Sequence, residues 1–358
     1  MQKNGTIDKN IRGYDPLMSP KQLIMDLPRT DAITETTEYG RQSIRNILDG
    51  TDSRKFVIVG PCSIHDAEAA YEYATRLKEI AYAVKDRLVI IMRSYFEKPR
   101  TSLGWKGLIY DPALNGEGHI KDGLYLSRKI LIEALELGLP CATEYLEPFT
   151  PQYNSDLISW AAIGARTTES PQHRQLASGL SMPVGFKNNT QGDIAVAVNA
   201  ILSAQGDHSF LGIDEYGSPS VVTTAGNQYT HIVLRGGNTD ANYDTQSVRN
   251  AQQMLTEADL PPNVMVDCSH GNSEKEYDKQ PVVFEAVLQQ IRDGNDGIVG
   301  IMLESNLKAG NQKIPADLRG FEKSDLEYGV SVTDGCIDWE TTASLLKAAH
   351  KSLTTSRI

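Results

Sequence analysis

The sequence has no long apolar segment. None of its stretches approaches the ~20 consecutive apolar residues that a membrane-spanning helix needs. Its N-terminal sequence, MQKNGTIDKNIRGYDPL, also lacks the apolar core of a signal peptide. We therefore predict a cytoplasmic protein that has no membrane partner.

Cysteine is scarce as well. The four cysteines stand at positions 62, 141, 268 and 336, and no two of them form a CxxC pair. Such spacing excludes a disulfide framework or a zinc ribbon as the basis of the fold. We expect four reduced thiols.

Basic residues do not outnumber acidic ones. The chain has 35 Lys and Arg against 46 Asp and Glu, which gives a formal net charge of −11. A protein that binds nucleic acid or an anionic membrane needs a basic face, so we expect neither partner. Small anionic substrates remain compatible with this charge, because a local basic pocket can outweigh an acidic exterior.

The chain does have eight short apolar runs, separated by mostly helical patterns. Such alternation favours a parallel sheet covered by helices. From it we predict an α/β fold, a (β/α)8 TIM barrel. The eight predicted strands are residues 55–62, 88–96, 139–146, 159–167, 182–188, 230–237, 263–270 and 297–305.

The helices are predicted from apolar residues at three- and four-residue spacing. Asp66 and Asp122 suit helix N-caps, and Gly138 suits a C-cap. The connections after the third and fourth predicted strands are shorter and less regular. The six clearer helices are residues 66–85, 123–137, 193–205, 243–257, 281–292 and 339–352.

Two segments exceed a minimal barrel. Residues 1–50 form an N-terminal extension with a helical pattern near residues 35–48, and residues 51–358 form the barrel. Within the barrel, residues 209–224 (SFLGIDEYGSPSVVTT) are typical of a β-hairpin, inserted before strand 6. Both segments are candidates for regulation or oligomerisation, and the alternative is that they only cover the barrel floor.

Every predicted strand has a polar or reactive residue near its C-terminal end. Active sites of barrel enzymes lie at that end of the strands, whereas the interior positions of these strands are apolar. Packing alone does not explain such a concentration of polar groups. The residues are Cys62, Arg93, Glu144, Arg166, Lys187, Arg235, His270 and Glu304.

A subset of these residues could bind a metal ion. Cys62, His270 and Glu304, with Asp334 from a loop that can fold over the barrel mouth, offer sulfur, nitrogen and oxygen ligands. A lone Cys or His is more often structural, so the prediction depends on the set. These ligands suit manganese, iron, cobalt, zinc or copper, one divalent ion per subunit, and disfavour magnesium.

The basic residues suggest anionic substrates. Six cations that converge at one mouth would repel one another unless anions neutralise them, and phosphate and carboxylate groups are the natural partners. The alternative, surface charge in scattered loops, is weak for residues at strand ends. The six are Arg93, Lys98, Arg100, Arg166, Lys187 and Arg235, with Thr101 beside them in the loop EKPRT.

Nine motifs in order resemble the class I 3-deoxy-D-arabino-heptulosonate-7-phosphate (DAHP) synthase family, and in particular its tyrosine-sensitive members. The resemblance covers nearly the whole chain. The motifs are GPCSIH (60–65), YFEKPRTSLGWKG (95–107), ATEYL (142–146), IGARTTES (163–170), PVGFKN (183–188), LRGG (234–237), VDCSHGNS (266–273), ESN (304–306) and SVTDGCIDWE (331–340).

The resemblance implies condensation of phosphoenolpyruvate with D-erythrose 4-phosphate and water, giving DAHP and phosphate, as the first step of the shikimate pathway. It implies Cys62, His270, Glu304 and Asp334 as metal ligands, and the chemistry of the condensation makes Lys98 the candidate proton donor and Glu144 the candidate to position the water. Phosphoenolpyruvate would contact Arg93, Ala165, Arg166, Lys187 and Arg235. Arg100 and Thr101 would receive the phosphate of erythrose 4-phosphate, Lys98 would lie between the two substrates, and Pro99 would also bind substrate.

The family is commonly inhibited by an aromatic amino acid, which implies an effector site and a homodimer or homotetramer. Phenylalanine-sensitive relatives tend to have Ser where this chain has Gly212, and the missing side chain leaves room for a phenol hydroxyl. Tyrosine is therefore favoured over phenylalanine or tryptophan; alternatively, Gly212 serves only strand geometry. The implied site residues are Pro151, Gln152, Leu180, Ser181, Phe210, Gly212 and Val221.

Three other functions compete with this interpretation. A 3-deoxy-manno-octulosonate-8-phosphate synthase would use the same nucleophile, but the KPRT loop and the N-terminal extension argue against it. A class II aldolase would present several histidines to its metal, whereas only His270 is well placed. A non-catalytic amino-acid sensor on the same barrel predicts eroded strand ends, and none is eroded.

Overall fold

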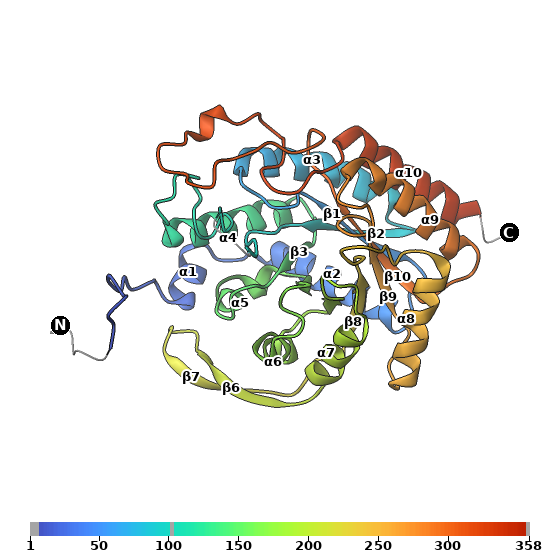
Figure 1. Ribbon diagram of the computed structural model, residues 1–358, viewed down its shortest axis with the longest axis horizontal. Helices are drawn as coiled ribbons and strands as arrows, with labels where there is room; N and C mark the ends of the chain where they lie inside the picture. The colour runs from blue at the N-terminus through green and yellow to red at the C-terminus, as the bar shows by residue number, and fades with distance from the viewer. Residues whose placement is uncertain (1–6, 101–103, 356–358) are drawn as a thin grey trace.

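Eight parallel strands close into a barrel in the structure, a computed structural model that describes residues 7–100 and 104–355. The strands follow one another around the barrel in chain order, and Figure 1 shows helices packed around the outside of these strands. The predicted (β/α)8 barrel is therefore confirmed. Its strands are β1 (Lys55–Gly60), β2 (Leu88–Arg93), β3 (Cys141–Glu144), β4 (Trp160–Ile163), β5 (Val184–Lys187), β8 (Thr230–Leu234), β9 (Val264–Asp267) and β10 (Ile298–Glu304).

The strands end earlier than the sequence predicted. Loop backbone can adopt conformations that a parallel ladder does not allow, and His270 has a φ of 59°. Apolar runs that continue into a loop therefore overestimate strand length. The predicted site residues that lie in the loops after their strands, and not within the strands, are Cys62, Arg166, Arg235 and His270.

The barrel is covered by helices that match the predictions within a few residues. Asp66 caps its helix as predicted, because its side chain accepts hydrogen bonds from the backbone N–H groups of Glu68 and Ala69. The helices are α3 (Ala67–Val84), α4 (Ile120–Glu136), α7 (Ala195–Gln205), α8 (Thr245–Glu257), α9 (Gln280–Arg292) and α10 (Trp339–Thr355).

The residues that cap α4 are not the predicted ones, Asp122 and Gly138, but residues a short way before them in the chain. Helix α4 begins at Ile120, so Asp122 lies in its first turn, and the N-cap is His119, whose side chain makes no capping hydrogen bond. A carboxylate in the first turn interacts favourably with the helix dipole, which gives Asp122 a reason to stand there. Leu137 is the C-cap, and Gly138 follows it with a φ of 83°, which glycine adopts without strain.

The connections after β3 and β4 contain only short helices, in agreement with their irregular sequence. Pro151 and Pro171 occupy the first turns of these helices, where a missing N–H costs no hydrogen bond. The short elements of the chain are α5 (Thr150–Asn154), α6 (Pro171–Gly179) and the 3-10 turns η1 (Ser155–Leu157), η2 (Tyr277–Lys279) and η3 (Lys323–Asp325).

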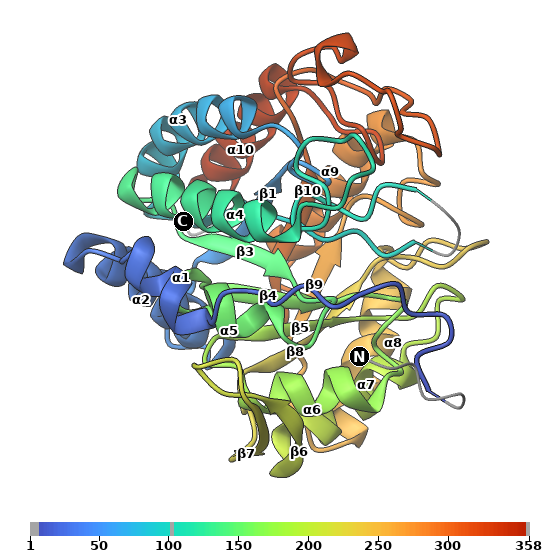
Figure 2. The same cartoon turned by 90° about the vertical axis from the view of Figure 1, so that its left-hand side faces the viewer.

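The N-terminal extension closes the barrel floor with α2 (Asp31–Leu48). Its residues Ile44, Ile47 and Leu48 belong to the same apolar cluster as the inward-facing side chains of the strands. Figure 2 shows α2 at one end of the barrel and the long loops that follow the strands at the other. The extension thus contributes to the core, whatever further role it has.

The inserted hairpin is confirmed as β6 (His208–Ile213) and β7 (Pro219–Thr224), which pair antiparallel. One face packs on α6, where the hydroxyls of Ser178 and Thr224 are 2.7 Å apart. On the other face Leu211 is 87% exposed. Helix α1 (Pro20–Asp26) reaches the hairpin turn, because Lys21 donates hydrogen bonds to Glu215 and Tyr216.

The described helices include none with both the length and the apolar character required to cross a bilayer.

Candidate active site

A cavity of about 320 Å³ opens among the loops that follow the strands. Most of the predicted site residues line it, although they come from all parts of the chain. Cys62 is fully buried beside it, Arg100 donates its Nε hydrogen to the carbonyl of Trp105 instead of lining it, and Thr101 lies outside the described residues. The predicted residues that line the cavity are Arg93, Lys98, Pro99, Glu144, Ala165, Arg166, Lys187, Arg235, His270, Glu304 and Asp334.

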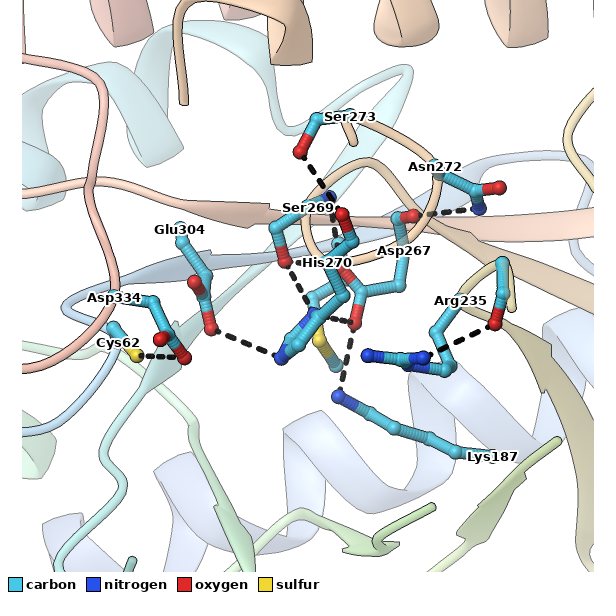
Figure 3. A network of polar contacts seen from close by, with 12 residues as sticks. Cys62, Lys187, Arg235, Asp267, Ser269, His270, Asn272, Ser273, Glu304 and Asp334 are labelled. Atoms are coloured by element: carbon cyan, nitrogen blue, oxygen red, sulfur yellow. Dashed lines mark hydrogen bonds and ion pairs between the residues drawn. The ribbon is translucent and has the colours of Figure 1, made fainter. Parts of the chain in front are cut away.

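Three of the four predicted metal ligands converge at one side of the cavity. One ligand atom each from Cys62, Glu304 and Asp334 lies within 4.8 Å of the others. His270 borders this group, with its Nε2 3.7 Å from Glu304 Oε1 (Figure 3). A thiol, an imidazole and two carboxylates at these positions fit a transition-metal ion. We call Cys62, Lys98, Glu304 and Asp334 the metal side.

Lys98 compensates the negative charge of the metal side. Its Nζ donates to Cys62 Sγ at 2.7 Å and to Asp334 Oδ2 at 3.2 Å. Lys98 holds the pKa of Asp334 below its usual range. Burial, followed by the charge of Glu304, raises the pKa of the Cys62 thiol to about 12, so metal binding would displace a proton from it.

Glu304 has a basic partner of its own. Arg93 Nη2 lies 2.9 Å from Glu304 Oε1, and both side chains are almost fully buried. Arg93 also donates hydrogen bonds to the carbonyls of Pro61 and Cys62, which fixes its guanidinium at the end of β1. Buried ion pairs depend on such additional hydrogen bonds, because desolvation of both charges is costly.

The opposite side of the cavity is positive. Arg166 and Arg235 form no ion pair within the described residues, while Lys187 pairs with Asp267 at 2.9 Å. Burial lowers the pKa of Arg235, so its charge lacks the compensation that Arg93 has. Two arginines without carboxylate partners form a site for an anion such as phosphate. We call Arg166, Lys187 and Arg235 the anion side.

Asp267 contacts two of the predicted site residues, and the sequence analysis did not single it out. Its Oδ2 lies 2.9 Å from Lys187 Nζ and 3.0 Å from His270 Nδ1, so it joins the anion side to the predicted metal ligand (Figure 3). Ser269 donates two further hydrogen bonds to Oδ1. The available signal was an acidic residue at the end of an apolar strand, three residues before His270.

The predicted effector residues occupy neighbouring elements outside the cavity. Pro151 and Gln152 lie on α5, Leu180 and Ser181 follow α6, and the others lie on the hairpin.

Gly212 has a steric reason of its own to be glycine. A Cβ at this position of β6 would lie 2.7 Å from Val222 Cγ2, on the paired strand β7. The close approach of Val222 therefore supports the alternative that Gly212 serves strand geometry, and it does not exclude a role in effector choice.

Comparisons with known proteins show the family of the chain. The model of the DAHP synthetase I family matches residues 30–347. The chain belongs to this family. A Tyr-sensitive phospho-2-dehydro-3-deoxyheptonate aldolase of Salmonella typhimurium is 48% identical to it over 353 residues, which cover 99% of this chain and 98% of the relative.

Two further relatives define how far the similarity extends. A Phe-sensitive phospho-2-dehydro-3-deoxyheptonate aldolase of Escherichia coli is also 48% identical, over 95% of each chain. The solved structure of the Francisella tularensis aldolase is 46% identical, with a TM-score of 0.93 over 98% of this chain and all of that one. Overall identity therefore establishes the family, but it does not indicate whether tyrosine or phenylalanine is the effector.

Proposed function

We propose that this member of the DAHP synthetase I family condenses phosphoenolpyruvate with D-erythrose 4-phosphate and water, and releases DAHP and phosphate. The observation that carries the proposal is the division of the cavity into a metal side and an anion side. Arg166 and Arg235 suit the phosphate of phosphoenolpyruvate, since neither is neutralised within the described residues. Relatives that span nearly the whole chain are named for the corresponding aldolase activity.

The metal side would hold one divalent ion, which supplies a Lewis acid for the aldehyde. Cys62, Glu304 and Asp334 would hold it together with His270. Lys98, 12% exposed at this side, would donate the proton that the aldehyde oxygen needs as the new carbon–carbon bond forms. Manganese, iron, cobalt, zinc and copper all remain candidates for the ion.

Erythrose 4-phosphate would lie toward Lys98 and Pro99, with its phosphate near Arg100 and Thr101. Lys98 and Pro99 line the cavity, which supports the assignment. For Arg100 the support is only that it follows them in the chain. The guanidinium would have to leave the Trp105 carbonyl to reach a substrate in the cavity.

One assay tests the proposed function. Purified protein is mixed with phosphoenolpyruvate and erythrose 4-phosphate, with and without a chelator, and the loss of the enolpyruvate absorbance is followed. We expect turnover that thorough chelation abolishes and added metal restores. Arabinose 5-phosphate in place of erythrose 4-phosphate tests the octulosonate synthase alternative. No turnover with metal restored, or turnover unaffected by metal removal, would contradict the proposal.

We further propose that tyrosine inhibits the enzyme at the hairpin. The support is Gly212 on β6, where the resemblance places Ser in phenylalanine-sensitive relatives. Gly212→Ser should weaken inhibition by tyrosine and strengthen inhibition by phenylalanine. Gly212→Ala is the control, because it adds the Cβ that crowds Val222 but no hydroxyl. Tyrosine inhibition that is unchanged in Gly212→Ser would contradict the proposal.

The extension and the hairpin are proposed to act together in regulation and in a homodimer or homotetramer. Their mutual contact through Lys21 and Glu215 supports this. The exposed apolar residues Leu211 and Val221 on the hairpin offer a surface for a second copy.

A further inference from the structure

Tyr95 lies in the wall of the cavity, two residues after the end of β2. Its side chain is 2% exposed and belongs to the apolar cluster inside the barrel. The guanidinium carbon of Arg93 is 3.5 Å from the centroid of its ring. This contact holds the ring in place and leaves the hydroxyl free to serve another group.

The hydroxyl of Tyr95 has no hydrogen-bond partner among the described residues. Other buried tyrosines do have one: Tyr73 donates to Ser305 Oγ and Tyr145 donates to Asn154 Oδ1. A buried polar group without a partner costs about 1–3 kcal/mol. Such a group in a cavity wall therefore points to a bound molecule as its partner.

Glu144 lines the same cavity and also forms no hydrogen bond or ion pair through its side chain within the described part of the chain. Its carboxylate approaches the backbone so closely that a Cβ on Gly164 would lie 2.3 Å from Oε1. Burial, and to a lesser degree the charge of Glu144, raises the pKa of Tyr95. Tyr95 thus offers a protonated donor and Glu144 an acceptor, and both residues line the same cavity.

The partner of this pair must both accept and donate a hydrogen bond. The oxygens of phosphoenolpyruvate only accept at neutral pH, and the carboxylate of Glu144 would repel them. Water meets both requirements, since it accepts from Tyr95 and donates to Glu144. We propose that Tyr95 and Glu144 together hold the water molecule that adds to C2 of phosphoenolpyruvate, which rests on the function proposed above.

The addition step balances with these groups. After C3 has bonded to the aldehyde carbon and Lys98 has protonated the aldehyde oxygen, C2 is electron-poor. The water oxygen bonds to C2 and one water proton passes to Glu144. The bond between C2 and the phosphate oxygen then breaks, and phosphate leaves with the electron pair. The remaining C2 hydroxyl loses its proton as the ketone forms.

Tyr95→Phe tests the inference, because it removes the hydroxyl and keeps the ring under Arg93. We expect kcat to fall at least about tenfold, the loss of one well-placed hydrogen bond. Direct binding of phosphoenolpyruvate, measured by calorimetry, should change less than about twofold. The Tm should stay the same or rise, because the variant no longer buries an unpaired hydroxyl.

Tyr73→Phe is the matched control. It removes the hydroxyl of an equally buried tyrosine that has a protein partner and does not line the cavity. It should lower the Tm and leave kcat unchanged. An unchanged kcat in Tyr95→Phe overturns the proposal, and so does a lower Tm with no change in kcat. Weaker binding of phosphoenolpyruvate at unchanged kcat would assign the hydroxyl to the substrate and also overturns it.

The wild-type protein separates this inference from the proposed function. If wild-type protein does not turn over the two substrates, the proposed function fails. If wild-type protein is active and Tyr95→Phe equals it, only the assignment of Tyr95 fails.

Discussion

On the metal side of the cavity each charged group has a partner, with Lys98 between Cys62 and Asp334 and Arg93 against Glu304. On the anion side Arg166 and Arg235 have no ion-pair partner among the described residues, although Arg235 donates a hydrogen bond to the carbonyl of Gly236. The first arrangement keeps a set of ligands in place, and the second keeps a positive field available for an anion. The comparison predicts that a substitution on the metal side changes metal affinity, whereas a substitution on the anion side changes the affinity for phosphoenolpyruvate.

Removal of a ligand from the metal side should have the largest effect. Since partners outside the ligand shell are worth about 10–100-fold in metal affinity, Cys62→Ala should reduce it by at least about 100-fold. Chelator competition measures the affinity, and the coupled loss of turnover confirms it. Cys141→Ala, at another buried thiol, is the control and should retain the metal. Equal metal affinity in the two variants would remove Cys62 from the ligand set.

Loss of an arginine on the anion side should act on phosphoenolpyruvate. Arg235→Gln should raise its KM about 10- to 100-fold, the worth of a hydrogen bond between charged groups, and leave metal affinity unchanged. Steady-state kinetics and chelator competition measure the two quantities. Arg319→Gln is the control, since that side chain is 83% exposed and pairs with Asp317. A metal affinity that falls as much as substrate affinity would break the comparison.

Asp267 contacts Lys187 of the anion side and the predicted metal ligand His270, so Asp267→Asn should change both binding constants. We expect each to weaken about tenfold, because the carboxylate orients His270 and compensates Lys187. Calorimetry with metal alone and with phosphoenolpyruvate alone measures them separately. Ser269→Ala, which keeps the carboxylate and removes the hydroxyl that contacts Asp267 Oδ1 and His270 Nδ1, is the milder control. A change confined to one ligand would show that Asp267 serves one side.

The smallest predicted effect is the pH dependence of stability that Glu97 causes. The pKa of Glu97 is raised, whereas that of Asp334 on the metal side is lowered. Burial raises the pKa of Glu97 to about 8, although backbone N–H groups of Leu146 and Glu147 oppose the shift. The folded state therefore binds the proton more tightly than the unfolded state, and stability falls as pH rises from about 4.5 to 8. Urea unfolding should show a decrease of at least about 1 kcal/mol across this range, as one pKa unit corresponds to about 1.4 kcal/mol.

The matched variant is Glu97→Gln, in which this pH dependence should disappear. Glu285→Gln, at a side chain that is 55% exposed, should keep the wild-type slope. A wild-type slope in Glu97→Gln would mean that other groups cause it.

The sequence predicted the barrel, the hairpin and most of the cavity because these depend on local patterns. Apolar periodicity marks strands and helices, and strand order places their ends together. The pairing of charges is different, since Asp267 with Lys187 joins residues 80 positions apart. Periodicity carries no information on such pairs, so the division into two sides was visible only in the structure.

Other predictions failed for local reasons. The apolar run before His270 continued past the end of β9, so this residue was placed in a strand instead of a left-handed loop position. Asp122 has the side chain of a helix cap, but its helix begins two residues before it. Arg100 donates to the carbonyl of Trp105 and does not line the cavity, so its contact with erythrose 4-phosphate stays a proposal.

The ammonium of Lys98 occupies a position between Cys62 and Asp334, where it already neutralises the ligands. A metal ion held by these proposed ligands would compete with the ammonium for the same sulfur and oxygen atoms. The proton donor proposed above and two of the proposed metal ligands thus belong to one hydrogen-bond network.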